Sequence, residues 1–215
     1  MPELEWPGLP ARAALHPAGL YLALQNIPAN ELRDPFMQQT IQRLAAPETI
    51  VHLAKTDIGN EPPWTAPRGL IFHVGRCGST AISQALKQHG SITVYAEPLP
   101  INDILAPPHT RPRDELIAAL RSLGAAFAAH AGQPYVLKFS SWNTLYCDVI
   151  ADAFPNTPWI FVLRDPVEVQ AVASEVLGRA LGASRVLYFE TRDRGFRVLR
   201  DYTDGVRSMA GEYPT

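Results

Sequence analysis

Apolar and polar residues follow two different spacings along the chain, and the spacing changes near residue 66. In residues 29–46 the apolar positions recur at the interval of an amphipathic helix, which Pro47 would end. Residues 47–58 are interpreted as a second helix, with Gly59 as its stop signal. We therefore predict that residues 1–66 form a helical N-terminal segment that packs on the core of the protein.

After residue 66 the chain shows short apolar runs separated by segments with helical periodicity. The predicted strands are residues 70–74, 91–97, 134–139 and 158–164. Helical segments between them include residues 111–132 and 143–154, and the pattern beyond them is consistent with a helix over 167–181 and a fifth strand over 184–190. Because strands that alternate with helices pair in parallel, we predict an α/β fold over residues 67–215, with a parallel sheet flanked by helices in three layers.

The composition fits a single domain overall and narrows the possible partners. With 215 residues, 47% of them hydrophobic, the chain is long enough for one good core but short for two. A formal net charge of -2 gives a nucleic-acid partner no electrostatic support from the chain as a whole. Cys77 and Cys147 lack the spacing of a zinc site or a disulfide scaffold. No stretch approaches the ~18 apolar residues of a membrane span, so we expect a cytoplasmic protein without one.

The turn after the first predicted strand, VGRCGSTAIS, has the composition of an anion-binding loop. Gly75 and Gly78 allow a ligand to approach the backbone closely, Arg76 supplies a cation, and Ser79 and Thr80 offer hydroxyls at a helix start. Taken alone, a tight turn with a hydroxyl helix cap explains the same residues. The triphosphate-binding loop is excluded, because it needs a lysine immediately before the hydroxyl residue.

The pattern Arg-x-Gly-Ser-Thr between a strand and a helix resembles the 5′-phosphosulfate loop of the sulfotransferase family, and the motifs RCGST, EP and RDPVEV resemble its bacterial branch. The resemblance covers about residues 36–175 and implies a P-loop-type fold that uses 3′-phosphoadenosine 5′-phosphosulfate (PAPS) as donor. It also implies roles for the loop: Arg76 replaces the family's loop cation, Gly78, Ser79 and Thr80 hold the 5′-phosphate, and Cys77 contributes its backbone N–H.

The segment WIFVLRDP matches a second motif of that family, in which an arginine after a strand binds the donor's 3′-phosphate. Here this arginine is Arg164, at the carboxyl end of its strand, where open parallel sheets place their ligands. The family usually has a serine eight residues later, and this chain has Val172. The nearest hydroxyl is that of Ser174, which we predict as the substitute ligand.

Sulfuryl transfer needs a base, because the acceptor hydroxyl or amine must lose a proton as it attacks. Where some family members have a histidine, this chain has Phe139 and Ser140. The resemblance to carbohydrate-modifying and bacterial members instead assigns the base to Glu97, which precedes Pro98. Lys138 would stabilise the charge that develops on the leaving phosphate oxygen. Both charged residues could also be solvated strand ends.

Together these features predict a sulfotransferase that moves a sulfuryl group from PAPS to a hydroxyl or amine of a small-molecule or carbohydrate acceptor, with no metal implied. A nucleotide-dependent kinase with a magnesium-binding Asp165 is one alternative. A nucleotide-binding protein without turnover is another, motivated by Val172. Acceptor pockets are built from variable loops, so the sequence does not name the acceptor.

Overall fold

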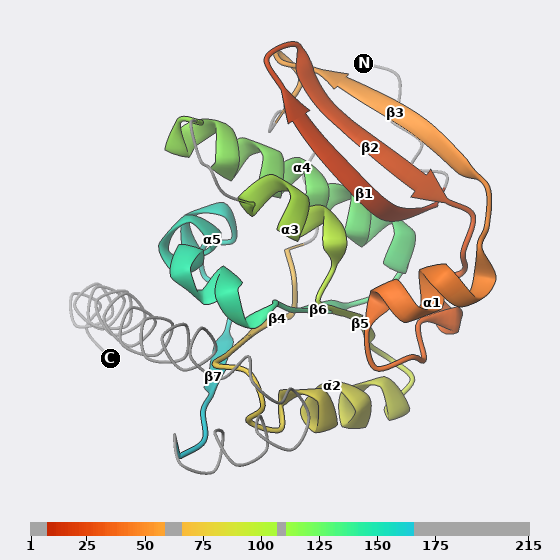
Figure 1. The fold of residues 1–215 in the computed structure, drawn as a ribbon, viewed down its shortest axis with the longest axis vertical. Coiled ribbons are helices and arrows are strands. Elements are labelled where there is room, and N and C mark those ends of the chain that lie inside the picture. Colours follow the sequence, from red (N-terminus) through yellow and green to blue (C-terminus); the bar gives the residue numbers. More distant parts are fainter. Residues whose placement is uncertain (1–7, 59–65, 107–110, 166–215) are drawn as a thin grey trace, which may run out of the picture.

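A computed structural model of the chain describes residues 8–58, 66–106 and 111–165. Its centre is a parallel sheet with strand order β5-β6-β4-β7 (Figure 1). The four strands are β4 (Gly69–His73), β5 (Thr93–Ala96), β6 (Tyr135–Lys138) and β7 (Trp159–Val162). All four strands predicted in this part of the sequence are confirmed, and so is the α/β class with a parallel sheet flanked by helices.

Helices cover both faces of the parallel sheet. Helix α2 (Ser79–Gln88) lies on one face, where Ile71, Val94 and Val136 form a small apolar cluster. The opposite face is covered by α3 (Leu99–Leu105), α4 (Arg113–Ala131), the 3-10 turn η2 (Ser141–Tyr146) and α5 (Cys147–Ala153). Successive strand residues point to opposite faces, so the unalternating apolar runs follow from burial on both sides.

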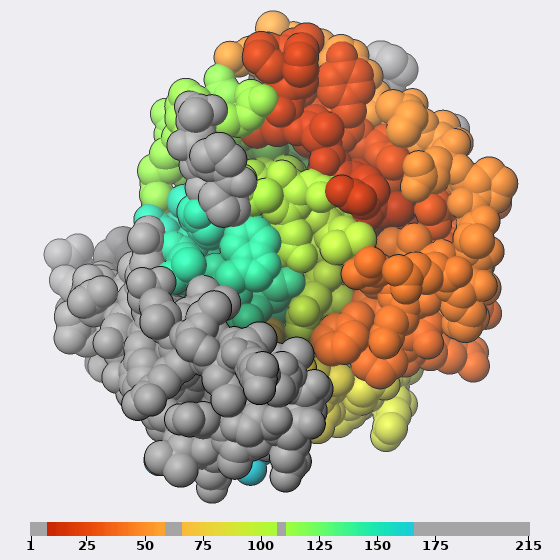
Figure 2. Space-filling model, in the orientation of Figure 1, coloured from red at the N-terminus to blue at the C-terminus, as the bar shows by residue number. Residues whose placement is uncertain are grey.

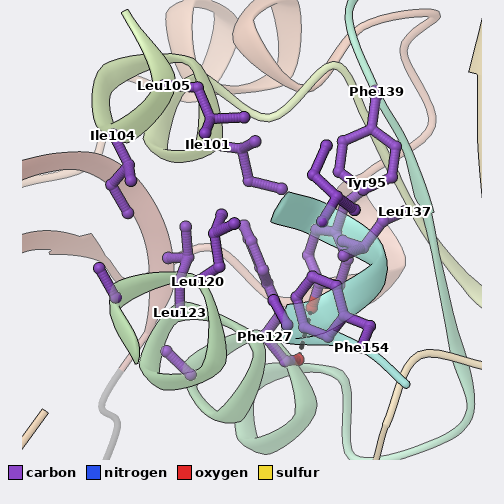
Figure 3. Close-up of a cluster of buried hydrophobic side chains, with 14 of the residues drawn as sticks. Tyr95, Ile101, Ile104, Leu105, Leu120, Leu123, Phe127, Leu137, Phe139 and Phe154 are labelled. Carbon is purple, nitrogen blue, oxygen red and sulfur yellow. Dashed lines mark hydrogen bonds between the residues drawn. The ribbon is translucent and has the colours of Figure 1, made fainter. Parts of the chain in front are cut away.

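The main core lies between the parallel sheet and helices α3, α4 and α5, as Figure 3 shows. Tyr95, Leu137 and Phe139 contribute from the strand side and Phe127 from α4, and all four are fully buried. Tyr95 donates its hydroxyl to the Phe127 carbonyl oxygen at 3.0 Å. The core therefore fixes the carboxyl ends of β5 and β6 firmly against the helical layer.

The helical interpretation of residues 1–66 is wrong for most of the described part of that segment. It forms an antiparallel sheet with strand order β1-β2-β3, and β1 packs on α3 and α4 (Figure 1). The strands are β1 (Leu9–His16), β2 (Gly19–Gln25) and β3 (Glu48–Ala54). A hairpin turn joins β1 to β2, and β-branched residues in the ETIVHLA run favour pairing of β3 with β2 over a helix.

In the described part of this N-terminal segment, only the middle is helical. The 3-10 turn η1 (Ala29–Glu31) and helix α1 (Met37–Leu44) lie within residues 29–46, where a helix was predicted. The red-to-orange N-terminal segment borders the yellow-green residues of the later chain on one continuous surface (Figure 2). Within the described ranges no helix has the length and apolar character to cross a bilayer. The predicted helix over 167–181 and strand over 184–190 lie outside the described residues.

Candidate active site at the carboxyl edge of the parallel sheet

The parallel pairing brings the ends of four strands to one edge. Ala96 of β5 is opposite Lys138 of β6, and Ile71 of β4 is opposite the same lysine. On the other side of β4, the amide of Val74 donates to the carbonyl oxygen of Val162 in β7 at 3.3 Å. The loop after β4, Glu97 after β5, Lys138 at the end of β6 and Arg164 after β7 therefore share one edge.

The loop between β4 and α2 has the backbone of an anion-binding turn. Gly75, Arg76 and Gly78 have φ values of 80°, 49° and 90°, in the left-handed region. No backbone oxygen among the described residues accepts a hydrogen bond from the amides of residues 76–80. Amides at the start of a helix that donate to no backbone oxygen can attract an anion through their partial charges and through the helix dipole.

The loop side chains differ in their exposure. Arg76 is exposed, Thr80 and Cys77 are half-buried, and Ser79 is buried. Burial raises the pKa of Cys77, but the adjacent His73 and the amides of the loop outweigh it, so the pKa of this thiol lies below its ordinary value. The sequence predicted only a backbone contribution from Cys77, whereas the structure places its thiol beside an imidazole.

Glu97 and Lys138 form an ion pair, with 2.5 Å between Oε1 and Nζ. The Lys138 side chain is fully buried and the Glu97 side chain is 27% exposed, so neither is the solvated strand end considered above. Lys138 also lies over the ring of Phe36, with Nζ 5.2 Å from its centroid. The lysine is thus enclosed between the N-terminal segment and the parallel sheet.

The backbone of Glu97 is held in an uncommon conformation. Its φ of 54° lies in the left-handed region, which costs free energy for a residue with a Cβ. A hydrogen bond from its amide to the Lys138 carbonyl oxygen, at 2.7 Å, fixes this conformation. Burial raises the pKa of Glu97, yet the polar contact with His73 and the charge and hydrogen bond of Lys138 outweigh it and bring its pKa below the ordinary value. Glu97 is therefore ionised at neutral pH.

A cavity of about 330 Å³ opens beside Glu97. It is lined by Phe36, Gln38, Gln39, Gln42, Glu97, Leu99, Asn102 and Ser140. Helix α1 and the residue before it supply one wall, so the N-terminal segment helps to build the site. These lining residues could not be predicted from the sequence, because their contribution depends on how α1 packs against the parallel sheet.

One carboxylate oxygen of Glu97, which lines the cavity, has no hydrogen-bond donor among the described residues. Oε1 accepts from Lys138, while no described residue donates to Oε2. The Asn102 amide donates to the Ser140 hydroxyl at 3.0 Å, and its Oδ1 is buried without a partner among the described residues. The cavity therefore combines an aromatic ring, amide groups and a carboxylate, which suits a polar acceptor with hydroxyl or amino groups.

His73 links the loop to Glu97, a role that sequence reasoning missed. It is the last residue of β4 and 4% exposed, with its Nε2 3.6 Å from Glu97 Oε1. The only signal was its position directly before the glycine-containing turn, where a polar side chain inside an apolar strand is unusual.

Of the two predicted ligands of the 3′-phosphate, the structure describes Arg164 but not Ser174. Arg164 is exposed and follows β7 at the same edge as the loop. Ser174 and Val172 lie outside the described residues. Within the described ranges there is no group of three or more His, Cys, Asp or Glu side chains that could hold a metal ion.

Comparisons with known proteins add no family assignment. No protein-family model matches this chain, and the searches of curated proteins and of solved structures returned no significant match.

Proposed function

We propose that the protein is a sulfotransferase that transfers a sulfuryl group from PAPS to a hydroxyl or amine. One observation carries the proposal: an ionised carboxylate with an unpaired oxygen lies at the same sheet edge as a loop in which the amides of residues 76–80 donate to no backbone oxygen of the described residues. Oε1 of Glu97 is 3.6 Å from Nε2 of His73, and Nδ1 of that imidazole accepts from the loop amide of Gly75 at 3.0 Å. His73 therefore lies between the candidate anion site and the candidate base and contacts both.

On the donor side, the amides of residues 76–80 and the Arg76 guanidinium would bind the 5′-phosphosulfate. Arg164, with Ser174 if it reaches the site, would bind the 3′-phosphate. Charge-assisted hydrogen bonds from arginine to phosphate are stronger than neutral ones and fix the donor's orientation. The donor's leaving group is already a stable phosphate, so the transfer does not intrinsically need a metal ion.

On the acceptor side, Glu97 would act as the general base from its unpaired Oε2. The acceptor oxygen or nitrogen forms a bond to sulfur and gives its proton to Oε2. The bond between sulfur and the bridging phosphate oxygen breaks, and 3′-phosphoadenosine 5′-phosphate leaves with the electron pair. Lys138 is too deeply buried to reach the leaving oxygen in this arrangement, so we assign it the role of holding Oε1 and orienting the carboxylate.

A second candidate is a nucleotide-binding protein without turnover. The ion pair between Glu97 and Lys138 favours it. Against the effect of burial, His73 and Lys138 together hold the pKa of Glu97 below its ordinary value, which weakens the carboxylate as a base. A kinase remains an alternative that a magnesium requirement would support.

The test compares binding and transfer in one preparation. Calorimetry should show binding of 3′-phosphoadenosine 5′-phosphate without magnesium and weaker binding of ATP with it. Labelled PAPS is then screened against sugars, phenols and amines. Glu97→Gln should lower turnover by about 10²–10⁴-fold while nucleotide binding survives. Glu97→Gln/Lys138→Met, which also removes the unpaired buried cation, should be equally inactive. Tight binding without transfer to any acceptor would favour the second candidate, and preference for ATP with magnesium would favour the kinase.

A further inference from the structure

We propose that His73 is a positioning residue that holds the anion-binding loop with one ring nitrogen and, with the other bonded to the Phe139 carbonyl oxygen, sets how closely the carboxylate of Glu97 can approach that loop. The inference rests on the proposed function, because it assigns the two sides of the imidazole to the donor and acceptor sides of the same site. His73 would not contact donor or acceptor itself. It would act by fixing the distance between the loop and the base.

The hydrogen bonds of His73 define the tautomer that this role needs. Nδ1 is 3.0 Å from the amide nitrogen of Gly75, and an amide can only donate, so Nδ1 must accept. Nε2 is 2.8 Å from the carbonyl oxygen of Phe139, which can only accept, so Nε2 must carry the proton. The contacts thus specify a neutral imidazole with its proton on Nε2.

The Nδ1 side fixes the start of the loop. Gly75 is the first of the three residues with left-handed φ, and its amide donates to Nδ1 of His73. Because Gly75 is tied down, the amides that follow it are held in one orientation before an anion arrives. Preorganised donors avoid the cost of ordering the loop on binding.

The Nε2 side limits how closely the base can approach the loop. Nε2 gives its one proton to the Phe139 carbonyl oxygen at 2.8 Å, and Glu97 Oε1 packs 3.6 Å from this nitrogen while it accepts from Lys138 Nζ at 2.5 Å. This leaves Oε2 as the oxygen that faces the acceptor. The Phe139 carbonyl, at the end of β6, sets the plane of the ring.

The hydrogen bonds of His73 with the loop depend on its protonation state, which the surrounding groups influence. Glu97 faces it from the end of β5, Lys138 from β6 and Cys77 from the loop. From η2, the uncharged Thr144 hydroxyl donates to the His73 carbonyl oxygen at 3.3 Å. A second proton on the ring would have to sit on Nδ1, where it opposes the Gly75 amide. Protonation of His73 should therefore release the loop.

Two substitutions separate the two sides of the ring. In His73→Asn the side-chain oxygen can stand where Nδ1 accepts, but the group at Nε2 is missing. In His73→Gln the terminal amide can reach the position of Nε2, but nothing accepts from Gly75. We expect His73→Gln to weaken binding of 3′-phosphoadenosine 5′-phosphate by about three- to tenfold. We expect His73→Asn to retain that affinity and to lower turnover by tenfold or more. His89→Gln, in an exposed residue away from the site, is the control.

Nuclear magnetic resonance tests the role without donor or acceptor. In the wild-type protein at pH 8, the ring nitrogens of His73 should show a proton on Nε2 alone. The Gly75 amide should exchange with solvent faster in His73→Gln than in His73→Asn. A proton on Nδ1 at pH 8, or equal Gly75 exchange in both variants, would overturn the positioning role. Wild-type protein that neither binds the nucleotide nor transfers sulfuryl would overturn the proposed function, while the resonance experiment still decides the role of His73.

Discussion

Lys138 donates to Oε1 of Glu97 across 2.5 Å at the ends of two neighbouring parallel strands, and the two partners are unequally buried. The lysine side chain is 0% exposed and the glutamate side chain 27% exposed. Removing the carboxylate therefore leaves a cation in the interior, whereas removing both charges leaves none. A charge without its partner is costly in an apolar environment.

We predict that Glu97→Gln lowers the free energy of unfolding by about 2–4 kcal/mol, because Lys138 then lacks a counterion. Glu97→Gln/Lys138→Met should recover most of this loss, since methionine has a similar shape and no charge. Urea unfolding of both variants beside the wild-type protein provides the measurement. Equal stabilities of the single and double variants would show that the ion pair does not govern the fold of this edge.

The same ion pair makes stability depend on pH in the acid range. The pKa of Glu97 lies below its ordinary value of 4.5, so the folded state binds the proton less readily than the unfolded state does. The stabilisation is present above pH 4.5 and is lost as the pH falls through the pKa of the folded state. Wild-type protein should therefore lose stability more steeply below pH 4.5 than Glu97→Gln/Lys138→Met. Parallel curves for the two proteins would contradict this assignment.

Arginine removal tests the donor site. Arg76→Ala and Arg164→Ala should each weaken binding of 3′-phosphoadenosine 5′-phosphate by about ten- to a hundredfold, because each removes a charge-assisted contact to phosphate. Arg33→Ala is a matched control, since Arg33 is exposed and bonds the carbonyl oxygen of Asn30 in its own segment. Calorimetry on the three variants provides the comparison. Wild-type affinity in both site variants would remove these residues from the donor site.

Substitution of Gly78 tests whether nucleotide binding depends on the backbone conformation of the loop, because a side chain at this position would not disturb the packing. A Cβ at Gly78 would meet nothing within 4 Å, and its φ is 90°. Gly132, after α4, has equally open surroundings and a φ of 60°. Replacement of either glycine by alanine should cost about 1–2 kcal/mol of stability through backbone strain. Only Gly78→Ala should also weaken nucleotide binding, which calorimetry can resolve; equal loss of binding in both would argue against a role of the loop backbone.

Lys87 is predicted to cost stability at neutral pH. It donates from α2 to the Asp34 carbonyl oxygen, and burial lowers its pKa to about 8, with Asp34 opposing and Lys138 adding to the shift. Between pH 8 and 10.5 the unfolded state binds more protons, so wild-type stability should rise with pH. Lys87→Met should be more stable than wild type by roughly 1 kcal/mol at pH 7, a gain discounted for solvent screening, and this gain should shrink toward pH 10.5. Lys55→Met, at an exposed lysine, is the control for unfolding measurements across this range.

Much of the parallel sheet could be predicted, and the physical reason is burial. Strands covered on both faces have apolar runs that need no partner to be identified, as in residues 70–74. The antiparallel sheet could not be predicted in the same way. Its third strand, ETIVHLA, mixes polar and apolar residues because much of it is exposed, and its pairing with β2 depends on contacts distant in sequence.

The candidate site shows the same division. The loop glycines and the strand-end charges at Glu97, Lys138 and Arg164 were found because backbone conformation and strand ends leave local signals. The role of His73 left only the signal of a polar residue inside an apolar strand, and the role of Phe36 left none. Each depends on one distance across the fold, 3.6 Å from His73 to Glu97 and 5.2 Å from Lys138 to the Phe36 ring.

The position of β4 between β6 and β7 also affects how the chain is made. Its partners follow it in the sequence, since Leu70 pairs with Leu137 on one side and with Trp159 on the other. During synthesis β4 leaves the ribosome as an apolar strand with two open edges, long before either neighbour exists. Such non-local pairing slows folding and exposes the nascent chain to misassociation. The strand that anchors the anion-binding loop is therefore also the segment for which we expect chaperone protection to matter most.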